Sequence, residues 1–186
     1  MTALVRLTRP LEIPVAPLLG IAAERAAEWP EYRRSMRKRA ANEVGALGEV
    51  VALAYLASLS ATVTEAGEIG HDLIVNGKTV DVKTKERTVA PLPHYECSVP
   101  EYLDGVQTPD VYLFVSLLSN GKVGMDRFER AWVLGTLPHT QFHAQATHWT
   151  TDMVDRRNNW RATIPVRNVP ISALHGPVVP QGAPCS

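Results

Sequence analysis

The fold is decided by one stretch of the chain, residues 71–85, which reads HDLIVNGKTVDVKTK. Its Asn-Gly pair at 76–77 is the strongest short-range signal for a two-residue β-hairpin turn. Counting outward from that turn places Asp72 opposite Asp81, with Lys83 on the same face of the second strand. One face of the expected hairpin is therefore mainly apolar, and the other carries two carboxylates and an ammonium group.

Two carboxylates that oppose each other across a strand ladder repel unless a cation neutralises them. Lys83 supplies one positive charge. A divalent cation would neutralise the pair better, because hard oxygen ligands at this spacing suit Mg²⁺ or Mn²⁺. The alternative is a solvated polar face on an edge hairpin, where the three charges only keep the sheet soluble.

A helix expected over residues 31–58 adds a third carboxylate. Its apolar residues recur at spacings of three and four, as a buried stripe requires, at Val44, Leu47, Val51 and Tyr55. Glu49 is the only charged residue between Glu43 and Glu65. A lone buried carboxylate is costly without a partner, and the glycines and alanines around Glu49 leave room for a strand or an ion. The alternative is a Glu exposed at the edge of the helix.

These elements, in this order, resemble the PD-(D/E)XK nucleases, the restriction-endonuclease-like superfamily. The family pattern is a Glu on a helix, then an Asp, then an acidic-X-Lys tripeptide on the next strand. Here it reads Glu49 in GALGEVVALAYL, Asp72 in HDLIV and Asp81-Val82-Lys83 in KTVDVKTKE, with a His where the family name has Pro. The resemblance spans residues 44–118. It implies an α/β fold with a mixed central sheet flanked by helices, built on an α-β-β-β-α-β core.

The same resemblance implies a reaction, the hydrolysis of DNA by a Mg²⁺-dependent deoxyribonuclease, most simply an endonuclease. Asp72, Asp81 and the backbone carbonyl of Val82 would bind one or two Mg²⁺ (or Mn²⁺) ions. Glu49 would bind a second ion or orient the attacking water, and Lys83 would position that water or stabilise the phosphorus centre. A small neutral domain of this family suits a structure-selective enzyme of phage or mobile-element type, such as a junction resolvase, often a homodimer.

Basic residues are the candidates for holding the DNA backbone, because phosphate neutralisation supplies most nonspecific affinity. Five of them crowd the start of the expected long helix, and two more end the second hairpin strand: Arg33, Arg34, Arg37, Lys38, Arg39, Lys85 and Arg87. A solvated helix face and a solvated strand end are the alternatives.

Composition limits the other possibilities. The chain has 186 residues, with 19 Lys plus Arg balancing 19 Asp plus Glu. This neutrality excludes a protein that coats DNA by bulk charge. Two cysteines exclude a disulfide framework and a four-cysteine metal site. No secretory signal is evident, and the weakly charged stretch 44–64 lacks the sustained Leu, Ile and Phe of a membrane span, so we expect a cytoplasmic protein that contacts no membrane.

The chain divides into an extended N-terminal arm with a short helix (1–30), the nuclease-like domain (31–175) and an unordered tail (176–186). Further elements are expected along it: a helix at 18–28, strands at 61–65, 110–118, 122–125, 131–134 and 160–165, an irregular stretch at 89–103 and a helix at 140–148. The run 110–118 is continuously apolar, as in a central strand that is covered on both faces.

The sequence offers weaker evidence for other sites and for other functions. His139 and His143 have the i, i+4 spacing of a helical metal pair, but no Glu follows as in a zinc protease. Cys97 and His94 lack a third group to orient them as a nucleophile and its base. Glu65 or Glu68 could take the place of Glu49. A noncatalytic nucleic-acid-binding or assembly module on the same fold remains the main alternative, followed by a hydrolase of another phosphoester.

Overall fold

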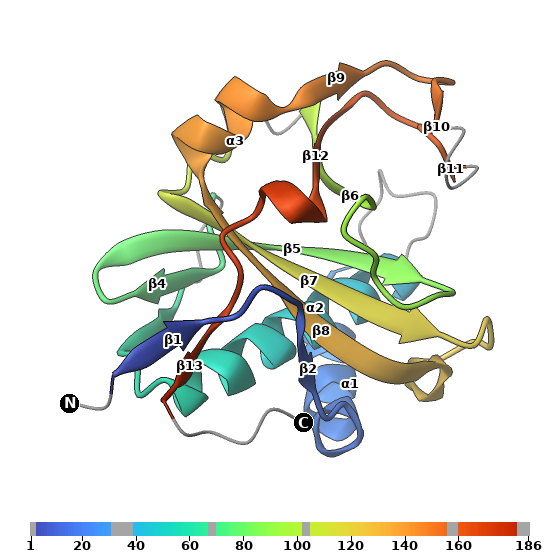
Figure 1. Cartoon of the computed structure of the whole chain (residues 1–186). Helices are drawn as coiled ribbons and strands as arrows, with labels where there is room; N and C mark the ends of the chain where they lie inside the picture. The colour runs from blue at the N-terminus through green and yellow to red at the C-terminus, as the bar shows by residue number, and fades with distance from the viewer. Residues whose placement is uncertain (1–2, 31–38, 67–69, 102–104, 156–159, 182–186) are drawn as a thin grey trace.

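The structure is a computed structural model, and it describes residues 3–30, 39–66, 70–101, 105–155 and 160–181. Its centre is a six-stranded sheet in the order β2-β8-β7-β5-β4-β3 (Figure 1). The strands are β2 (Leu11–Ile13), β3 (Val63–Glu65), β4 (Leu73–Val75), β5 (Lys78–Arg87), β7 (Val111–Ser119) and β8 (Phe128–Pro138). β5 and β7 run parallel and the other pairs run antiparallel, so the sheet is mixed and the fold is α/β.

The hairpin prediction is confirmed. Asn76 and Gly77 both have positive φ, at 50° and 80°, as a tight two-residue turn between twisted strands requires. The register is the expected one, with Val75 opposite Lys78 and Leu73 opposite Val80. The predicted central strand is also confirmed, since β7 lies between β5 and β8 and is almost wholly buried.

Helices cover one face of the sheet. α1 (Leu19–Glu28) matches the predicted short helix, and α2 (Arg39–Ser58) is the described part of the predicted long one; residues 31–38 lie outside the description. α2 packs on β5, β7 and β8. Its predicted stripe is buried as expected, in one core with alternate residues of β7: Val44, Leu47, Val51, Tyr55, Leu113, Val115 and Leu117. α2 is long and apolar enough to cross a membrane by composition, but 56% of that window is buried inside the fold, as in the core helix of a soluble domain.

The other face carries a smaller layer that the sequence did not foretell. β6 (Glu96–Pro100), β12 (Val166–Pro170) and β9 (Thr147–Trp149) form a three-stranded sheet, with α3 (His139–Gln145) beside it (Figure 1). A second core fills the space below this layer. The predicted helix 140–148 therefore ends early and gives way to β9. The predicted strand 160–165 is replaced by the short β11 (Trp160–Arg161), which pairs with β10 (Val154–Asp155), and by the later β12.

The connection from β5 to β7 departs from the expected α-β-β-β-α-β core. That core has a helix between its third and fourth strands. In the described residues of this connection, 88–101 and 105–110, there is no α-helix, and β6 is present instead. The expectation of an irregular stretch there was wrong for β6, and so was the expected second core helix in the described part. Backbone pairing with β12 gives this segment the structure that its local sequence does not predict.

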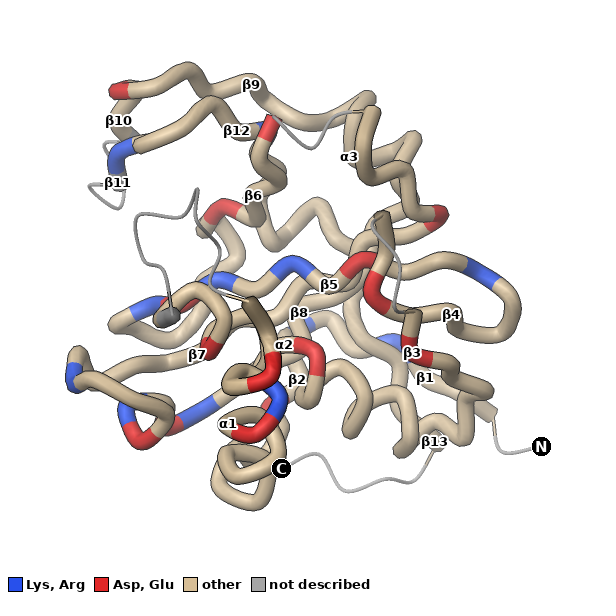
Figure 2. The backbone as a smooth tube through the Cα atoms, turned by 180° about the vertical axis from the view of Figure 1, so that it is seen from behind, with Lys and Arg blue, Asp and Glu red and all other residues tan. Residues whose placement is uncertain are grey.

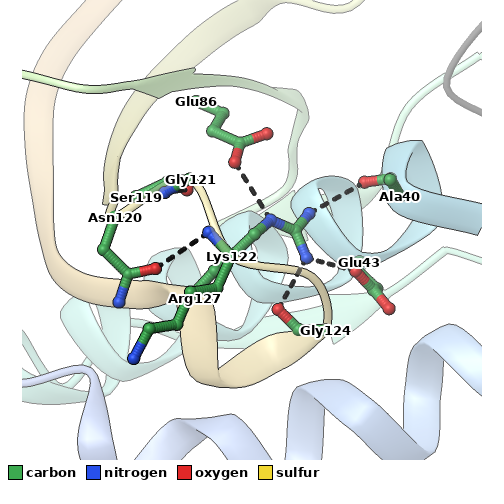
Figure 3. A network of polar contacts seen from close by, with 9 residues as sticks. All are labelled: Ala40, Glu43, Glu86, Ser119, Asn120, Gly121, Lys122, Gly124 and Arg127. Atoms are coloured by element: carbon green, nitrogen blue, oxygen red, sulfur yellow. Dashed lines mark hydrogen bonds and ion pairs between the residues drawn. The ribbon is translucent and has the colours of Figure 1, made fainter.

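The predicted strand 122–125 is wrong as well. A loop with positive φ at Gly121 and Gly124 and a short 3-10 turn (Met125–Arg127) precedes β8. Arg127 explains this arrangement, because its buried guanidinium binds Glu43 of α2, Glu86 of β5 at 3.0 Å and the Gly124 carbonyl at 2.7 Å (Figure 3). The network ties α2 and β5 to the loop before β8.

Segments near both ends of the described chain belong to the folded unit. β13 (Val178–Pro180) pairs with β1 (Leu4–Arg6), so the prediction that 176–186 is unordered was wrong for this strand. β2 is the edge strand of the central sheet, paired with β8. The expected boundary at residue 30 therefore does not separate an independent arm, because segments before it complete the sheet.

Candidate active site

A notch in the central sheet opens where β4 stops and β5 continues. The ladder between them begins at Leu73 opposite Val80, so among the described residues the rest of β5 has no partner strand on that edge. Asp72 lies just before β4, and its own N–H donates to the Val80 carbonyl at 3.0 Å. The Val82 N–H, freed from the ladder, donates to Asp72 Oδ2 at 2.7 Å. The Asp72 carboxylate thus takes the place of a strand at the edge of β5.

The Val82 carbonyl faces the same notch, because the N–H and C=O of one residue in a strand point to the same edge. The side chain of Val82 points toward α2 with that of Val80, where both join the core. Asp81 and Lys83 alternate with them and point to the other face of the sheet. At the notch, β5 therefore presents apolar side chains toward α2 and charged side chains toward the other face.

Asp81 and Lys83 form an ion pair, with Nζ of Lys83 2.7 Å from Oδ2 of Asp81. Asp81 is 1% exposed, and its Oδ2 has no partner in hydrogen-bonding geometry. Nζ of Lys83 also donates to Oε1 of Gln107 at 2.8 Å. Gln107 was missed by the sequence reasoning, because a lone Gln in a loop gives no signal of its distant partner.

Glu49 reaches the notch from α2, and a glycine makes this possible. A Cβ on Gly48 would lie 1.7 Å from Oγ1 of Thr84, so only glycine lets α2 lie this close to β5. Thr84 directly follows Lys83 on the strand. The close approach therefore brings Glu49, the next residue of the helix, to the charged part of β5.

The electrostatics show that the three carboxyl groups influence one another. Burial raises the pKa of Asp72, and the charges of Asp81 and Glu49 raise it further, while the Val82 N–H opposes the shift. Burial likewise raises the pKa of Glu49 to about 7, against the opposing effect of Arg25 and with smaller contributions from Glu65 and Asp81. The charges of Asp81 and Glu49 thus both act on Asp72, and Lys83 pairs with Asp81. Glu49 approaches from the α2 side, whereas Asp81 and Lys83 lie on the other face of the sheet.

Arg25 of α1 is a second residue that the sequence did not reveal. Its Nη1 lies 3.0 Å from Oε2 of Glu49, and its Nη2 lies 2.6 Å from Oε2 of Glu65. Glu65 therefore lies beside Glu49 rather than in its place, and residue 68 is outside the described part of the chain. Figure 2 shows red segments on α1, α2 and β3 and beside β4, and blue segments along β5.

The carboxylate oxygens and the Val82 carbonyl are suitable ligands for a divalent ion, but the side chains are not arranged around one position. Within the described residues, no three His, Cys, Asp or Glu side chains are arranged to hold a metal ion. Arg25 pairs with Glu49 and Lys83 pairs with Asp81, so each cation already neutralises a carboxylate. The charges of Asp81 and Glu49 raise the pKa of Asp72, so further positive charge at this edge would stabilise the carboxylates. Carboxylate oxygens with one backbone carbonyl fit Mg²⁺ or Mn²⁺.

Lys85 and Arg87, expected to hold phosphates, bind β6 instead. Arg87 Nη2 donates to the Glu96 carbonyl at 2.7 Å and its guanidinium covers the Tyr95 ring, while Lys85 Nζ donates to Oγ of Ser98 at 3.2 Å. Both side chains thus join the two sheets. Of the expected basic cluster, residues 33, 34, 37 and 38 and the side chain of Arg39 lie outside the described part of the chain.

The other candidate groups do not join the notch. The rings of His139 and His143 lie 4.3 Å apart on α3, next to Tyr112. Cys97 is buried in the second core, and burial raises the pKa of its thiol to about 12, which removes it as a nucleophile.

Comparison of the chain with protein-family models, with curated proteins and with solved structures finds no match. Fold and site together therefore define an α/β domain with a carboxylate-lysine notch.

Proposed function

We propose that the chain is a Mg²⁺-dependent nuclease that hydrolyses DNA phosphodiester bonds as an endonuclease, with Mn²⁺ as an alternative ion. One observation carries the proposal: Asp72 accepts from the Val82 N–H at the open edge of β5, next to the Asp81–Lys83 ion pair, and the charge of Glu49 acts on Asp72. Phosphoryl transfer depends mostly on placement and electrostatic stabilisation, so a few such groups suffice.

The order of elements supports a restriction-endonuclease-like fold. α2 carries the Glu, β3 and β4 follow as antiparallel strands, β5 carries the Asp-Val-Lys motif, and β7 pairs with β5 in parallel. The β6 layer between β5 and β7 would be a departure from that fold.

Asp72, Asp81 and the Val82 carbonyl would hold the ion. When bound, a divalent ion lowers the pKa of water and neutralises charge that develops on the phosphate. Lys83 would place its ammonium group beside the phosphate oxygens, with Gln107 fixing its direction at 2.8 Å. Glu49, with a pKa of about 7, is suited to orient the attacking water and accept its proton as the bond to phosphorus forms and the 3′ oxygen leaves.

DNA as the substrate, a homodimer as the assembly and the cytoplasm as the location belong to the same proposal. They rest on the motif Glu49, Asp72, Asp81-Val82-Lys83 and on the run of basic residues before Ala40. The proposal also includes selectivity for DNA structure, as in nucleases of phage or mobile-element type.

One observation favours a noncatalytic module as the second candidate. Arg25 and Lys83 neutralise two of the carboxylates without any metal, as a fold that has lost its chemistry would need. Such a module would bind nucleic acid through its surface and leave the strand intact.

A cleavage assay separates these functions. Supercoiled plasmid, single-stranded DNA and branched DNA are incubated with the purified protein and Mg²⁺ or Mn²⁺. The proposal expects strand cleavage that EDTA abolishes and that Asp81→Ala or Lys83→Ala removes. Asp126→Ala and Lys78→Ala are matched controls, because both residues are exposed and lie outside the notch.

Intact DNA at every metal concentration, with retained DNA binding, would support the noncatalytic module instead. Turnover of small phosphoesters without salt-sensitive DNA binding would support a hydrolase of another substrate.

A further inference from the structure

Arg25 occupies a particular place in the acidic group. It bridges Glu49 and Glu65 with different nitrogens of one guanidinium, at 3.0 and 2.6 Å. Its side chain is 19% exposed and that of Glu49 is 16% exposed, so water screens this pair only partly. A planar guanidinium that binds two carboxylates keeps its charge and its direction.

The packing of α1 fixes Arg25 in this position. Ala22 and Ala26, on either side of it in sequence, are buried where α1 packs on α2. Small residues at these positions let the two helices approach closely. The packing of the helix pair therefore keeps Arg25 within reach of Glu49.

The two ends of the acidic group differ as a result. At the Glu49 end, Arg25 already neutralises the carboxylate. At the Asp72 end, the flexible Lys83 pairs with Asp81 at 2.7 Å, while the Asp72 carboxylate accepts from the uncharged Val82 N–H. A divalent ion would relieve repulsion at the Asp72 end, whereas at Glu49 it would have to displace a fixed positive charge.

We propose that Arg25 is a built-in counterion that occupies Glu49 in place of a second metal ion and limits the site to one divalent ion, held by Asp72 and Asp81. This inference rests on the proposed function and deepens it, because it assigns Glu49 to the attacking water and not to the metal. Arg25 is thus a positioning residue that acts through Glu49.

The test counts bound ions. Titration calorimetry with Mn²⁺ at pH 8 gives the stoichiometry, and electron paramagnetic resonance detects spin coupling between two Mn²⁺ ions about 4 Å apart. We expect one ion in the wild type and in Arg25→Lys, which keeps the charge. We expect two coupled ions in Arg25→Gln, and one again in the double variant Arg25→Gln/Glu49→Gln.

A second set of variants keeps Arg25 unchanged. Glu49→Gln alone is expected to leave the Mn²⁺ stoichiometry at one and the affinity within about threefold of the wild type, whereas Asp81→Asn removes binding. Glu28→Gln, an exposed change on α1, is the matched control.

The outcomes separate this inference from the proposed function. Two ions in the wild type, one ion in a folded Arg25→Gln variant, or a tenfold loss of affinity in Glu49→Gln would overturn the role of Arg25 and leave the nuclease proposal intact. A wild-type protein that binds no Mn²⁺ would overturn both.

Discussion

Gly48 of α2 lies so close to Thr84 of β5 that a single methyl group on the glycine would overlap the threonine side chain, at 1.7 Å from Oγ1 and 2.7 Å from Cβ. This contact sets the distance between the helix that carries Glu49 and the strand that carries Asp81 and Lys83. The backbone of β5 cannot yield easily, since β7 pairs with it along its length.

Gly48→Ala is therefore expected to lower the free energy of unfolding by about 1–3 kcal/mol, the usual cost of overpacking a core, and to move Glu49 away from the notch. Urea denaturation measures the loss. Gly20→Ala is the control, because nothing lies within 4 Å of its added Cβ and α1 should gain up to about 1 kcal/mol from the better helix former. Equal stability of the two variants would show that α2 can shift freely.

The raised pKa values of Glu49 and Asp72 predict how stability depends on pH in EDTA. Each folded-state carboxyl group holds its proton more tightly than the unfolded chain does, so rising pH favours unfolding. A pKa of about 7 in place of 4.5 corresponds to a loss of about 3 kcal/mol for Glu49 between these pH values, and Asp72 adds a loss in the same direction.

Urea denaturation from pH 5 to pH 8 checks this slope, which Glu49→Gln and Asp72→Asn should each flatten. Mn²⁺ should restore stability more at pH 8 than at pH 5, because the ion takes the place of the protons. Stability that stays level or rises over this range would contradict the burial and mutual repulsion of the carboxyl groups.

Lys83→Gln is expected to reduce DNA cleavage by about 100-fold or more, since it removes a cation from the position of developing negative charge. The fold and the binding of Mn²⁺ should persist, because Asp72 and Asp81 remain and Asp81 loses a competing cation. Single-turnover cleavage and Mn²⁺ titration measure the two effects. Lys78→Gln, at the exposed start of β5, should change neither. Loss of Mn²⁺ binding together with cleavage would assign Lys83 a structural role instead.

Arg127→Met should cost up to about 3 kcal/mol, because it leaves the partly buried carboxylates of Glu43 and Glu86 without their common partner (Figure 3). Arg130→Met is the matched control. Arg130 also binds a carboxylate, that of Glu12, but its side chain is 48% exposed, so water screens the pair and its loss should cost much less. Similar losses in the two variants would mean that the Arg127 network does not fix α2 on β5.

The local signals of the sequence were sufficient for the elements around the notch. The Asn76-Gly77 turn dictates its own backbone conformation and register, and the stripe from Val44 to Tyr55 has only one helical face to bury. Because these elements are adjacent in sequence, counting residues gave the pairing of Leu73 with Val80. The ladder ends there, so Asp72 is not the strand partner of Asp81 as predicted but binds the Val82 N–H at the edge of β5. The place of Glu49 could not be counted from the hairpin, because Glu49 lies on a separate helix. The signal that selected it was its single charge within an apolar run.

Long-range contacts could not be anticipated in the same way. β6 and β12 are strands because they pair with each other, about seventy residues apart in the chain. The tail strand Val178–Pro180 exists because β1 lies beside it, despite its prolines. Arg25 and Gln107 entered the site through helix packing and loop placement, which no local pattern encodes. Lys85 and Arg87 differed from expectation for the same reason, since the layer that they hold was not foreseen.

The most direct test of the central claim is the anomalous diffraction of a crystal soaked in Mn²⁺. The account predicts a peak within about 2.5 Å of carboxylate oxygens of both Asp72 and Asp81 and of the Val82 carbonyl. A crystal with no peak at the notch, or with its peak between His139 and His143 of α3, would contradict it.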